Sequence, residues 1–341
     1  MDCAEGSTTP AAAGASCRAP TGLLAASFGA LDSAGCLRAV GTDVRALDCR
    51  LGHPRPWGHD ARMPPVAIPD LTELREQIRA RNGKRPKGPE LPLVEDFPGP
   101  GGLALRRYGH GEPRPVLVFV HGGAWVLGDL DTHDRTCRRI AATCGVEVLA
   151  VDYRLAPEHP CPTGIDDVAA VLRWARPWAV AGDSAGGYLA TLACLRLRDA
   201  GESVPAAQIL LCPNTDLTLS QPSVEEKGTG YGLDADFLAW AVEQWAPDHE
   251  QRLDPMLSPI RISDLRGLPR TVLVTAEHDA LRDEGEAYAK RMTEAGISVT
   301  YRCEPGLVHG FIQGMDLTSP EAAAAHERVF VDIRALVDET P

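Results

Sequence analysis

The residues best suited to chemistry lie in the pentapeptide Gly-Asp-Ser-Ala-Gly at residues 182–186. An apolar run at 178–181 precedes it, and a helix-forming run at 188–198 follows it. This order predicts a strand, a sharp turn and a helix, which together present a serine hydroxyl at the C-terminal end of a strand. The helix would point its first N–H groups at the reacting centre. Ser184 is therefore the candidate nucleophile, and an ordinary helix-capping serine is the alternative.

A serine nucleophile needs a base to take its proton and a carboxylate to orient that base. His309 follows the last predicted strand, which places it at the carboxyl edge of a parallel sheet, and it is the candidate base. His278 competes for this role, but it adjoins the candidate carboxylates. Asp279 is favoured over Asp283, because Asp283 falls in a first helical turn, where acids complement the helix dipole. The chain order of nucleophile, acid and base is that of the α/β-hydrolases.

Negative charge that develops on a carbonyl oxygen needs N–H donors. The candidate donors are the backbone N–H groups of Gly122 and Gly123, in a His-Gly-Gly-Ala stretch, and of Ala185 beside the nucleophile. Glycine lets the backbone approach a substrate with no Cβ in the way. A simple Gly-Gly turn is the alternative, and His121 is interpreted as part of this loop rather than as a base.

Composition and charge describe an ordinary globular protein and exclude several partners. The chain has 44% hydrophobic and 24% charged residues, with a net charge of −13, which argues against binding to nucleic acid or to an anionic membrane surface. It has no apolar run near the ~18 residues that span a bilayer. Its acidic start lacks a basic signal region, so a cytoplasmic location is expected. Ten Cys without metal-like spacing predict neither a metal site nor a disulfide framework.

The chain divides into three parts. Residues 1–62 are rich in Ala, Gly, Pro and Ser and form an N-terminal extension without clear periodicity. Residues 63–92 carry a predicted cap helix over 70–81, with Asp70 as its N-cap. Residues 93–341 form the predicted α/β core. Within it, the proline-rich segment 213–262 interrupts the alternation of strands and helices and is interpreted as a cap insertion.

Short apolar runs alternate with amphipathic segments throughout the core. Strands are predicted over residues 103–108, 116–120, 146–151, 178–181, 208–212, 271–276 and 298–303. Helices are predicted over residues 132–143, 165–175, 185–198, 234–245, 282–295 and 320–337. Apolar strands separated by helices predict a mostly parallel sheet covered by helices on both faces. Ligands of such sheets bind at the carboxyl ends of the strands.

Between residues 93 and 336, six segments resemble the hormone-sensitive-lipase-like branch of the α/β-hydrolases, also called bacterial esterase family IV. They are HGGAW (121–125), VDYRLAPEHPCP (151–162), GDSAGG (182–187), PNTDLT (213–218), AEHDALRDEGEAYAKRM (276–292) and GLVHGF (306–311). The resemblance implies a cofactor-free carboxylic-ester hydrolase that acts on short to medium acyl chains through an acyl-Ser184 intermediate. It also implies that two chains pair through the last strand and helix, so a homodimer is expected.

The chain departs from the family pattern in three places. Ala124 stands where the family more often has Gly, and its methyl group is expected to narrow the alcohol side of the site. Arg176-Pro177 replaces a longer segment before the nucleophile strand. The first sixty residues resemble no part of the family.

Trp125, Asp183 and Tyr188 are assigned to the substrate pocket. Further apolar side chains of the insertion fit an acyl or alcohol pocket, or pack the cap onto the core: Tyr231, Phe237, Leu238, Trp240 and Trp245. An alternative function is a deacetylase or amide hydrolase that tailors one specialised metabolite. A small-molecule receptor is a second alternative, because this branch includes a plant hormone receptor with an incomplete triad. The presence of all three triad candidates here argues against the receptor.

Overall fold

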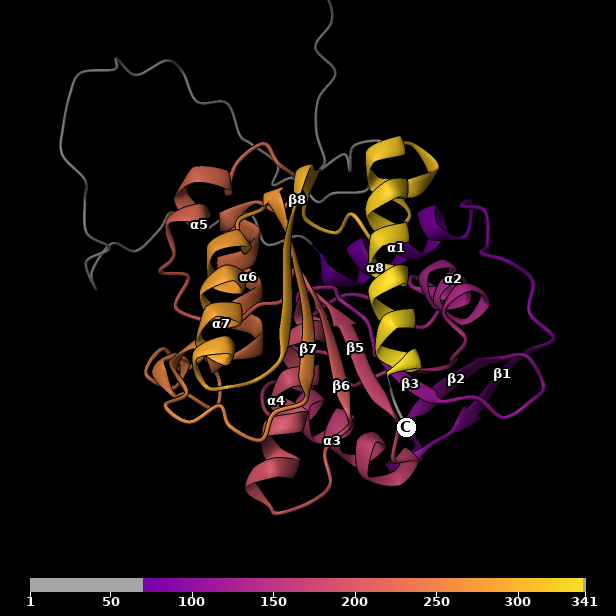
Figure 1. Ribbon diagram of the computed structural model, residues 1–341. Helices are drawn as coiled ribbons and strands as arrows, with labels where there is room; N and C mark the ends of the chain where they lie inside the picture. The colour runs from indigo at the N-terminus through magenta and orange to yellow at the C-terminus, as the bar shows by residue number, and fades with distance from the viewer. Residues whose placement is uncertain (1–69, 340–341) are drawn as a thin grey trace, which may run out of the picture.

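The computed structural model describes residues 70–339 (Figure 1). The N-terminal extension expected at residues 1–62 lies outside the described residues. The fold is built on one eight-stranded sheet with the order β1-β2-β4-β3-β5-β6-β7-β8. The strands are β1 (Leu93–Pro98), β2 (Ala104–Gly109), β3 (Val116–Val120), β4 (Glu147–Val151), β5 (Ala179–Asp183), β6 (Ala207–Leu211), β7 (Arg270–His278) and β8 (Val299–Val308).

Pairing in the sheet is parallel from β4 through to β8, and antiparallel for β1 with β2 and for β2 with β4. The strands β4, β5 and β6 are buried along their whole length, as expected for parallel strands that are covered on both faces. The predicted fold class, a mostly parallel sheet flanked by helices, is thereby confirmed.

Helices cover both faces of the sheet. In Figure 1, α8 lies in front of the sheet and α3 and α4 lie behind it. The helices are α1 (Leu71–Asn82), α2 (Asp134–Cys144), α3 (Thr163–Ala175), α4 (Ala185–Asp199), α5 (Pro222–Lys227), α6 (Ala235–Trp245), α7 (Arg282–Glu294) and α8 (Pro320–Asp338). Two apolar cores follow from this layering, one under α3, α4, α6 and α7 and one under α2 and α8. No helix in residues 70–339 is long and apolar enough to cross a membrane.

Two elements differ from the prediction. The strand β1 was not predicted, because its sequence carries two acids and ends in proline, and it becomes a strand only through pairing with β2, from Leu93 opposite Gly109 to Pro98 opposite Ala104. The helix α5 has only six residues and starts with Pro222. Such a short helix has too little periodicity to be recognised. Both α5 and α6 belong to the segment between β6 and β7 that was predicted as an insertion.

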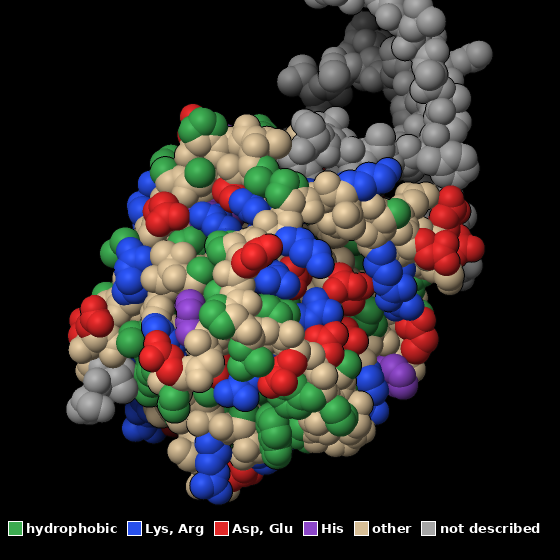
Figure 2. All heavy atoms as spheres, turned by 90° about the vertical axis from the view of Figure 1, so that its right-hand side faces the viewer, with side chains coloured by type: hydrophobic (Ala, Val, Ile, Leu, Met, Phe, Trp, Pro, Cys, Tyr) green, Lys and Arg blue, Asp and Glu red, His purple; other side chains and the backbone are tan. Residues whose placement is uncertain are grey.

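Acidic and basic side chains are interspersed over the surface that Figure 2 shows, which faces the right-hand side of Figure 1. The pairs on α2 include Arg135 with Asp316 at 2.6 Å and Arg139 with Glu327 at 3.2 Å. The side chain of Glu327 is 58% exposed, and an exposed pair such as Arg139–Glu327 adds little stability, about 0–1 kcal/mol. The interspersed charges show that the net charge of −13 does not form a single acidic face here.

The helix α1 has no fully buried residue; its partly buried Leu71, Leu74 and Ile78 pack against the core, and polar contacts attach it further. Its N-cap Asp70 accepts hydrogen bonds from the N–H groups of Thr72 (2.9 Å) and Glu73 (3.1 Å). Arg75 donates its Nε–H to the carbonyl oxygen of Val126 at 2.8 Å and forms an ion pair with Glu158 at 2.6 Å. The helix is therefore attached directly to the loop that follows β3.

Replacement of Arg75 by alanine should release α1 from that loop. The change removes charged hydrogen bonds worth about 1.5–3 kcal/mol each, so hydrogen exchange of the amides in 71–82 should speed up about tenfold or more, because each 1.4 kcal/mol is a factor of ten. Glu76→Ala is the matched control, since Glu76 is exposed on the same helix. Equal protection of α1 in wild type and Arg75→Ala would show that Arg75 does not hold the helix.

Candidate active site

Ser184 lies at the turn between β5 and α4, with φ 55° and ψ −123°. Its backbone N–H donates to the carbonyl oxygen of Leu211 at 2.8 Å, which ties the turn to β6. The residue is 6% exposed. The hydroxyl thus stands at the carboxyl end of the central parallel strands, where ligands of such sheets bind.

His309 bridges the hydroxyl and a carboxylate. Its Nε2 lies 2.9 Å from Ser184 Oγ, and its Nδ1 lies 2.8 Å from Asp279 Oδ2. The second carboxylate oxygen of Asp279 accepts the N–H of Leu281 at 2.9 Å. The structure therefore brings together the three residues predicted as nucleophile, base and acid, although 125 positions separate Ser184 from His309.

The two competing candidates lie elsewhere. Asp283 accepts the N–H of Ser223 at 2.9 Å and pairs with Arg282 at 2.7 Å. The ring of His278 stacks on Tyr231, with centroids 5.0 Å apart. Both side chains are thus engaged outside the Ser–His–Asp chain.

The pKa of His309 depends on the charge of Asp279. Burial by itself lowers the pKa of His309, but the charge and the hydrogen bond of Asp279, with a contribution from the charge of Asp183, raise this pKa above its usual value. Because a carboxylate accepts at Nδ1, the ring proton is on that nitrogen and the Nε2 lone pair faces Ser184. This tautomer can take a proton from the hydroxyl.

Cys212 lies beside this pair. Its sulfur and ligand atoms of Asp279 and His309 lie within 4.8 Å of one another, the kind of cluster that could hold a metal ion. Burial, followed by the charge of Asp279, raises the pKa of the Cys212 thiol well above its usual value, and a metal binds the thiolate. The His309 Nδ1–H is also already donated to Asp279. The arrangement fits proton transfer better than metal binding.

In the loop after β3, the N–H of one predicted oxyanion donor, Gly122, is already engaged. The N–H of Gly122 already donates to Asp183 Oδ1 at 2.9 Å. Within residues 70–339, the N–H groups of Gly123, Ala124 and Ala185 have no acceptor. Ala124 was considered only as a departure from glycine, so its N–H was missed. It lies in a turn with φ 52°, closed by a 3.1 Å hydrogen bond from the N–H of Val126 to Gly123.

His121 opens this loop as a neutral residue. Burial, followed by the charge of His133, lowers the pKa of His121 to about 4. Its ring stacks on Tyr153 at 4.3 Å, and its Nδ1 lies 2.9 Å from the carbonyl oxygen of Gly122. A neutral, buried imidazole in this place supports the loop, in agreement with the interpretation of His121 as part of it.

Asp183, which was assigned to the substrate pocket, directs its carboxylate to buried donors. The residue is 2% exposed, and its carboxylate accepts from the N–H of Gly122 and from Gln313 Nε2. These contacts hold the carboxylate of Asp183 in the interior, where Gly122 and Gln313 donate to it.

Trp125 and Tyr188, the other two predicted pocket residues, belong to a closed aromatic cluster with Trp245. The rings of Trp125 and Trp245 stack with centroids 5.8 Å apart, and Trp125 meets Tyr188 edge-on at 5.2 Å. Trp245 Nε1 donates to the hydroxyl of Tyr188 at 3.3 Å. All three residues are fully buried. This geometry favours the alternative interpretation, in which these aromatics pack α6 onto the core.

Comparison with known proteins agrees with this architecture. A family described as the alpha/beta hydrolase fold matches residues 117–313. The carboxylic ester hydrolase LipN of Mycobacterium tuberculosis is 38% identical over 283 residues, which cover 76% of this chain and 75% of LipN. The carboxylesterase NlhH of the same organism is 44% identical over 229 residues, or 63% of this chain and 71% of NlhH.

A solved structure shares the fold. The hyperthermophilic esterase of Pyrobaculum calidifontis superposes with a TM-score of 0.71 at 35% sequence identity. The match covers 78% of this chain and 94% of that protein.

Substitution of Gly186 by alanine should disrupt the turn at Ser184. Gly186 lies in the first turn of α4, where a Cβ would clash with the carbonyl oxygen of Val120 on β3. Alanine normally favours a helix by about 1 kcal/mol over glycine, so a large loss of thermal stability here would come from the clash. Gly83→Ala is the control, because its Cβ would lie 3.4 Å from the nearest atom and its φ is −60°. Equal melting temperatures for the two variants would contradict the close packing of α4 on β3.

Proposed function

This chain belongs to the α/β-hydrolase fold family, in its hormone-sensitive-lipase-like branch, and we propose that it hydrolyses carboxylic esters through an acyl-Ser184 intermediate. The observation that carries the proposal is the hydrogen-bond chain from Ser184 through His309 to Asp279. The esterase names of LipN, NlhH and the Pyrobaculum protein support the reaction class.

The first half of the reaction transfers the acyl group. Ser184 Oγ attacks the ester carbonyl carbon while His309 Nε2 takes the hydroxyl proton. The carbonyl oxygen becomes negative and accepts hydrogen bonds from the N–H groups of Gly123, Ala124 and Ala185. Each donor in such a site stabilises the transition state by about 3 kcal/mol. When the carbon–oxygen bond of the ester breaks, His309 gives its proton to the departing alcohol, and the acyl group stays on Ser184.

The second half returns the enzyme to its starting state. His309 takes a proton from a water molecule, whose oxygen attacks the acyl carbon. The bond to Ser184 Oγ breaks, the proton returns to that oxygen, and the carboxylic acid leaves. Asp279 stabilises the positive charge that His309 carries in both halves.

Substrate size is proposed from the elements around the site. The helix α1 and the segment 213–262 are proposed to form the cap over the site and to limit the acyl chain to short or medium length. The methyl group of Ala124 beside Gly123 supports a narrow alcohol side.

A homodimer in the cytoplasm stays part of the proposal. Within the described residues, β8 ends the sheet order and its outer edge carries no strand, so a second copy could pair there.

Replacement of Ser184 by alanine should lower kcat/KM for p-nitrophenyl esters by about 10⁴-fold or more, as for other serine hydrolases. Assays from acetate to dodecanoate would size the acyl pocket, and a p-nitroanilide would report amide cleavage. Ser298→Ala, at an exposed position, is the matched control. A folded Ser184→Ala variant that keeps its turnover would exclude the acyl-enzyme. If wild type cleaves neither substrate and does not react with a fluorophosphonate, the receptor alternative gains support.

Replacement of Asp279 by asparagine should lower kcat/KM by about 10³- to 10⁴-fold, because His309 loses the acceptor that sets its tautomer. The acid limb of the pH profile should also move to lower pH, since the carboxylate that raises the pKa of His309 is gone. Asp283→Asn, which removes the charge of one of the two acidic partners of Arg282, should keep most activity. The opposite ranking of the two variants would assign the acid to Asp283.

A further inference from the structure

One buried carboxylate outside the triad joins three segments of the chain. Asp183 Oδ1 accepts the N–H of Gly122 at 2.9 Å, and Oδ2 accepts Gln313 Nε2 at 2.6 Å. His133 Nε2 lies 3.2 Å from Oδ1. Burial of a carboxylate is costly unless donors surround it, and here three donors come from three different segments.

Two of these segments carry the proposed chemistry. Gly122 directly precedes Gly123 in the loop of oxyanion donors. Gln313 follows His309 by four residues, and its N–H closes the turn at Gly310 with a 2.9 Å hydrogen bond. The carboxylate of Asp183 is itself one residue from the nucleophile. It therefore lies where the loops of nucleophile, base and oxyanion donors meet.

We propose that Asp183 is a positioning residue that fixes the oxyanion loop and the His309 loop relative to Ser184. This inference rests on the serine-hydrolase function proposed above. A carboxylate suits the task because both of its oxygens accept, so each loop is held by an oxygen of the same side chain. An asparagine would offer one acceptor and would turn its NH₂ group toward Gln313 or His133, both of which donate.

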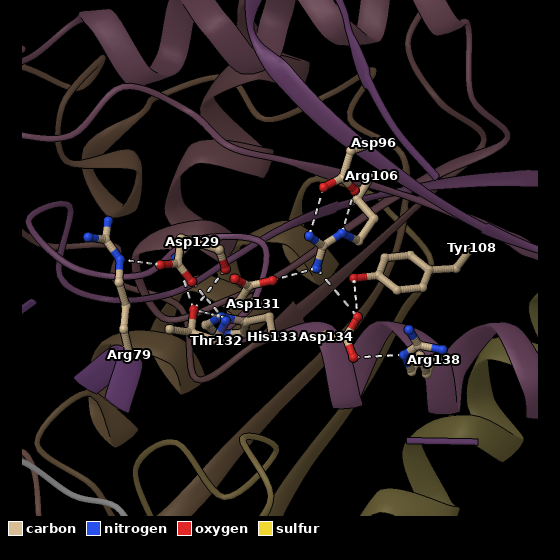
Figure 3. Close-up of polar contacts among 10 residues, drawn as sticks. All are labelled: Arg79, Asp96, Arg106, Tyr108, Asp129, Asp131, Thr132, His133, Asp134 and Arg138. Carbon is tan, nitrogen blue, oxygen red and sulfur yellow. Dashed lines mark hydrogen bonds and ion pairs between the residues drawn. The ribbon is translucent and has the colours of Figure 1, made fainter. Parts of the chain in front are cut away.

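His133, the third donor to Asp183, is also held at its other ring nitrogen, Nδ1 (Figure 3). His133 Nδ1 lies 3.0 Å from Thr132 Oγ1. The carboxylate of Asp129 accepts the N–H of Thr132 at 2.8 Å and pairs with Arg79 of α1 at 2.8 Å. The orientation of the His133 ring is thus linked to the docking of α1. From His133 the polar chain continues to Asp183, which Figure 3 does not draw.

Asp183 also acts on His309 through its charge. Burial alone would raise the pKa of Asp183, but His133 and the hydrogen bonds from His133, Gln313 and Gly122 lower it to about 2. The side chain is therefore ionised at neutral pH. Its charge adds to that of Asp279 in raising the pKa of His309. Loss of the charge lowers that pKa, so the acid limb of kcat/KM moves to lower pH.

The experiment compares Asp183→Asn with wild type on a p-nitrophenyl ester over a pH series. We expect kcat to fall by about 10²-fold, the size of effect that a displaced donor or a misplacement of about 1 Å has. KM should stay within about threefold, and the acid limb should move to lower pH. Asp167→Asn is the matched control: Asp167 is 4% exposed and pairs with Arg154, away from the triad. It should leave the acid limb in place.

A second variant separates position from charge. Gln313→Leu cuts the link to the His309 loop but keeps the charge of Asp183. It should lower kcat about tenfold and leave the acid limb unmoved. This variant also serves as the test if Asp183→Asn does not fold, and an unchanged kcat in folded Gln313→Leu would overturn the proposal.

Two outcomes for Asp183→Asn would overturn the proposal. One is a folded variant with wild-type kcat and an unmoved acid limb. The other is a loss of activity that is equal at every pH and is matched by fewer sites in a fluorophosphonate titration, which would show a merely structural role. Ser184→Ala is run in parallel. If it is inactive while Asp183→Asn is normal, only the positioning role fails, whereas an active Ser184→Ala rejects the hydrolase mechanism itself.

Discussion

The backbone turn at Ser184 is the constraint on which the rest of the site depends. Its φ of 55° and ψ of −123° lie in a region that residues other than glycine rarely occupy, at a cost of about 1–3 kcal/mol. The neighbouring elements hold it there: its N–H donates to Leu211 on β6, and its carbonyl oxygen accepts the N–H of Tyr188 in α4 at 3.1 Å. A relaxed turn would move the hydroxyl away from His309 and from the loop after β3.

Much of the architecture could be predicted, because parallel strands that are buried on both faces have continuous apolar sequences. The bounds predicted for β3, 116–120, agree with those of the structure, and α4 begins at Ala185 as predicted. The same logic predicted the meeting of Ser184, Asp279 and His309, since each follows or ends a strand of one parallel sheet. Strand ends on one edge bring together residues that are far apart in the chain.

Side-chain direction could not be predicted in the same way. Asp183 was assigned to the pocket, yet its carboxylate faces the interior and accepts the N–H of Gly122. The direction follows from the turn geometry and from the distant Gln313 and His133, which no local pattern reveals. The strand β1 was missed for a related reason, because it depends on its partner β2 rather than on its own periodicity.

The tight packing of Gly186 against Val120 limits where this molecule can vary. A side chain at Gly186 has no room, so α4 rests directly on the strand that leads into the oxyanion loop. The proposed nucleophile and the proposed oxyanion donors therefore form one unit, and the distance between them is difficult to change by substitution. New substrate preferences must come from elements outside that unit, such as α1, α5 and α6, whose contacts can change without disturbing the turn.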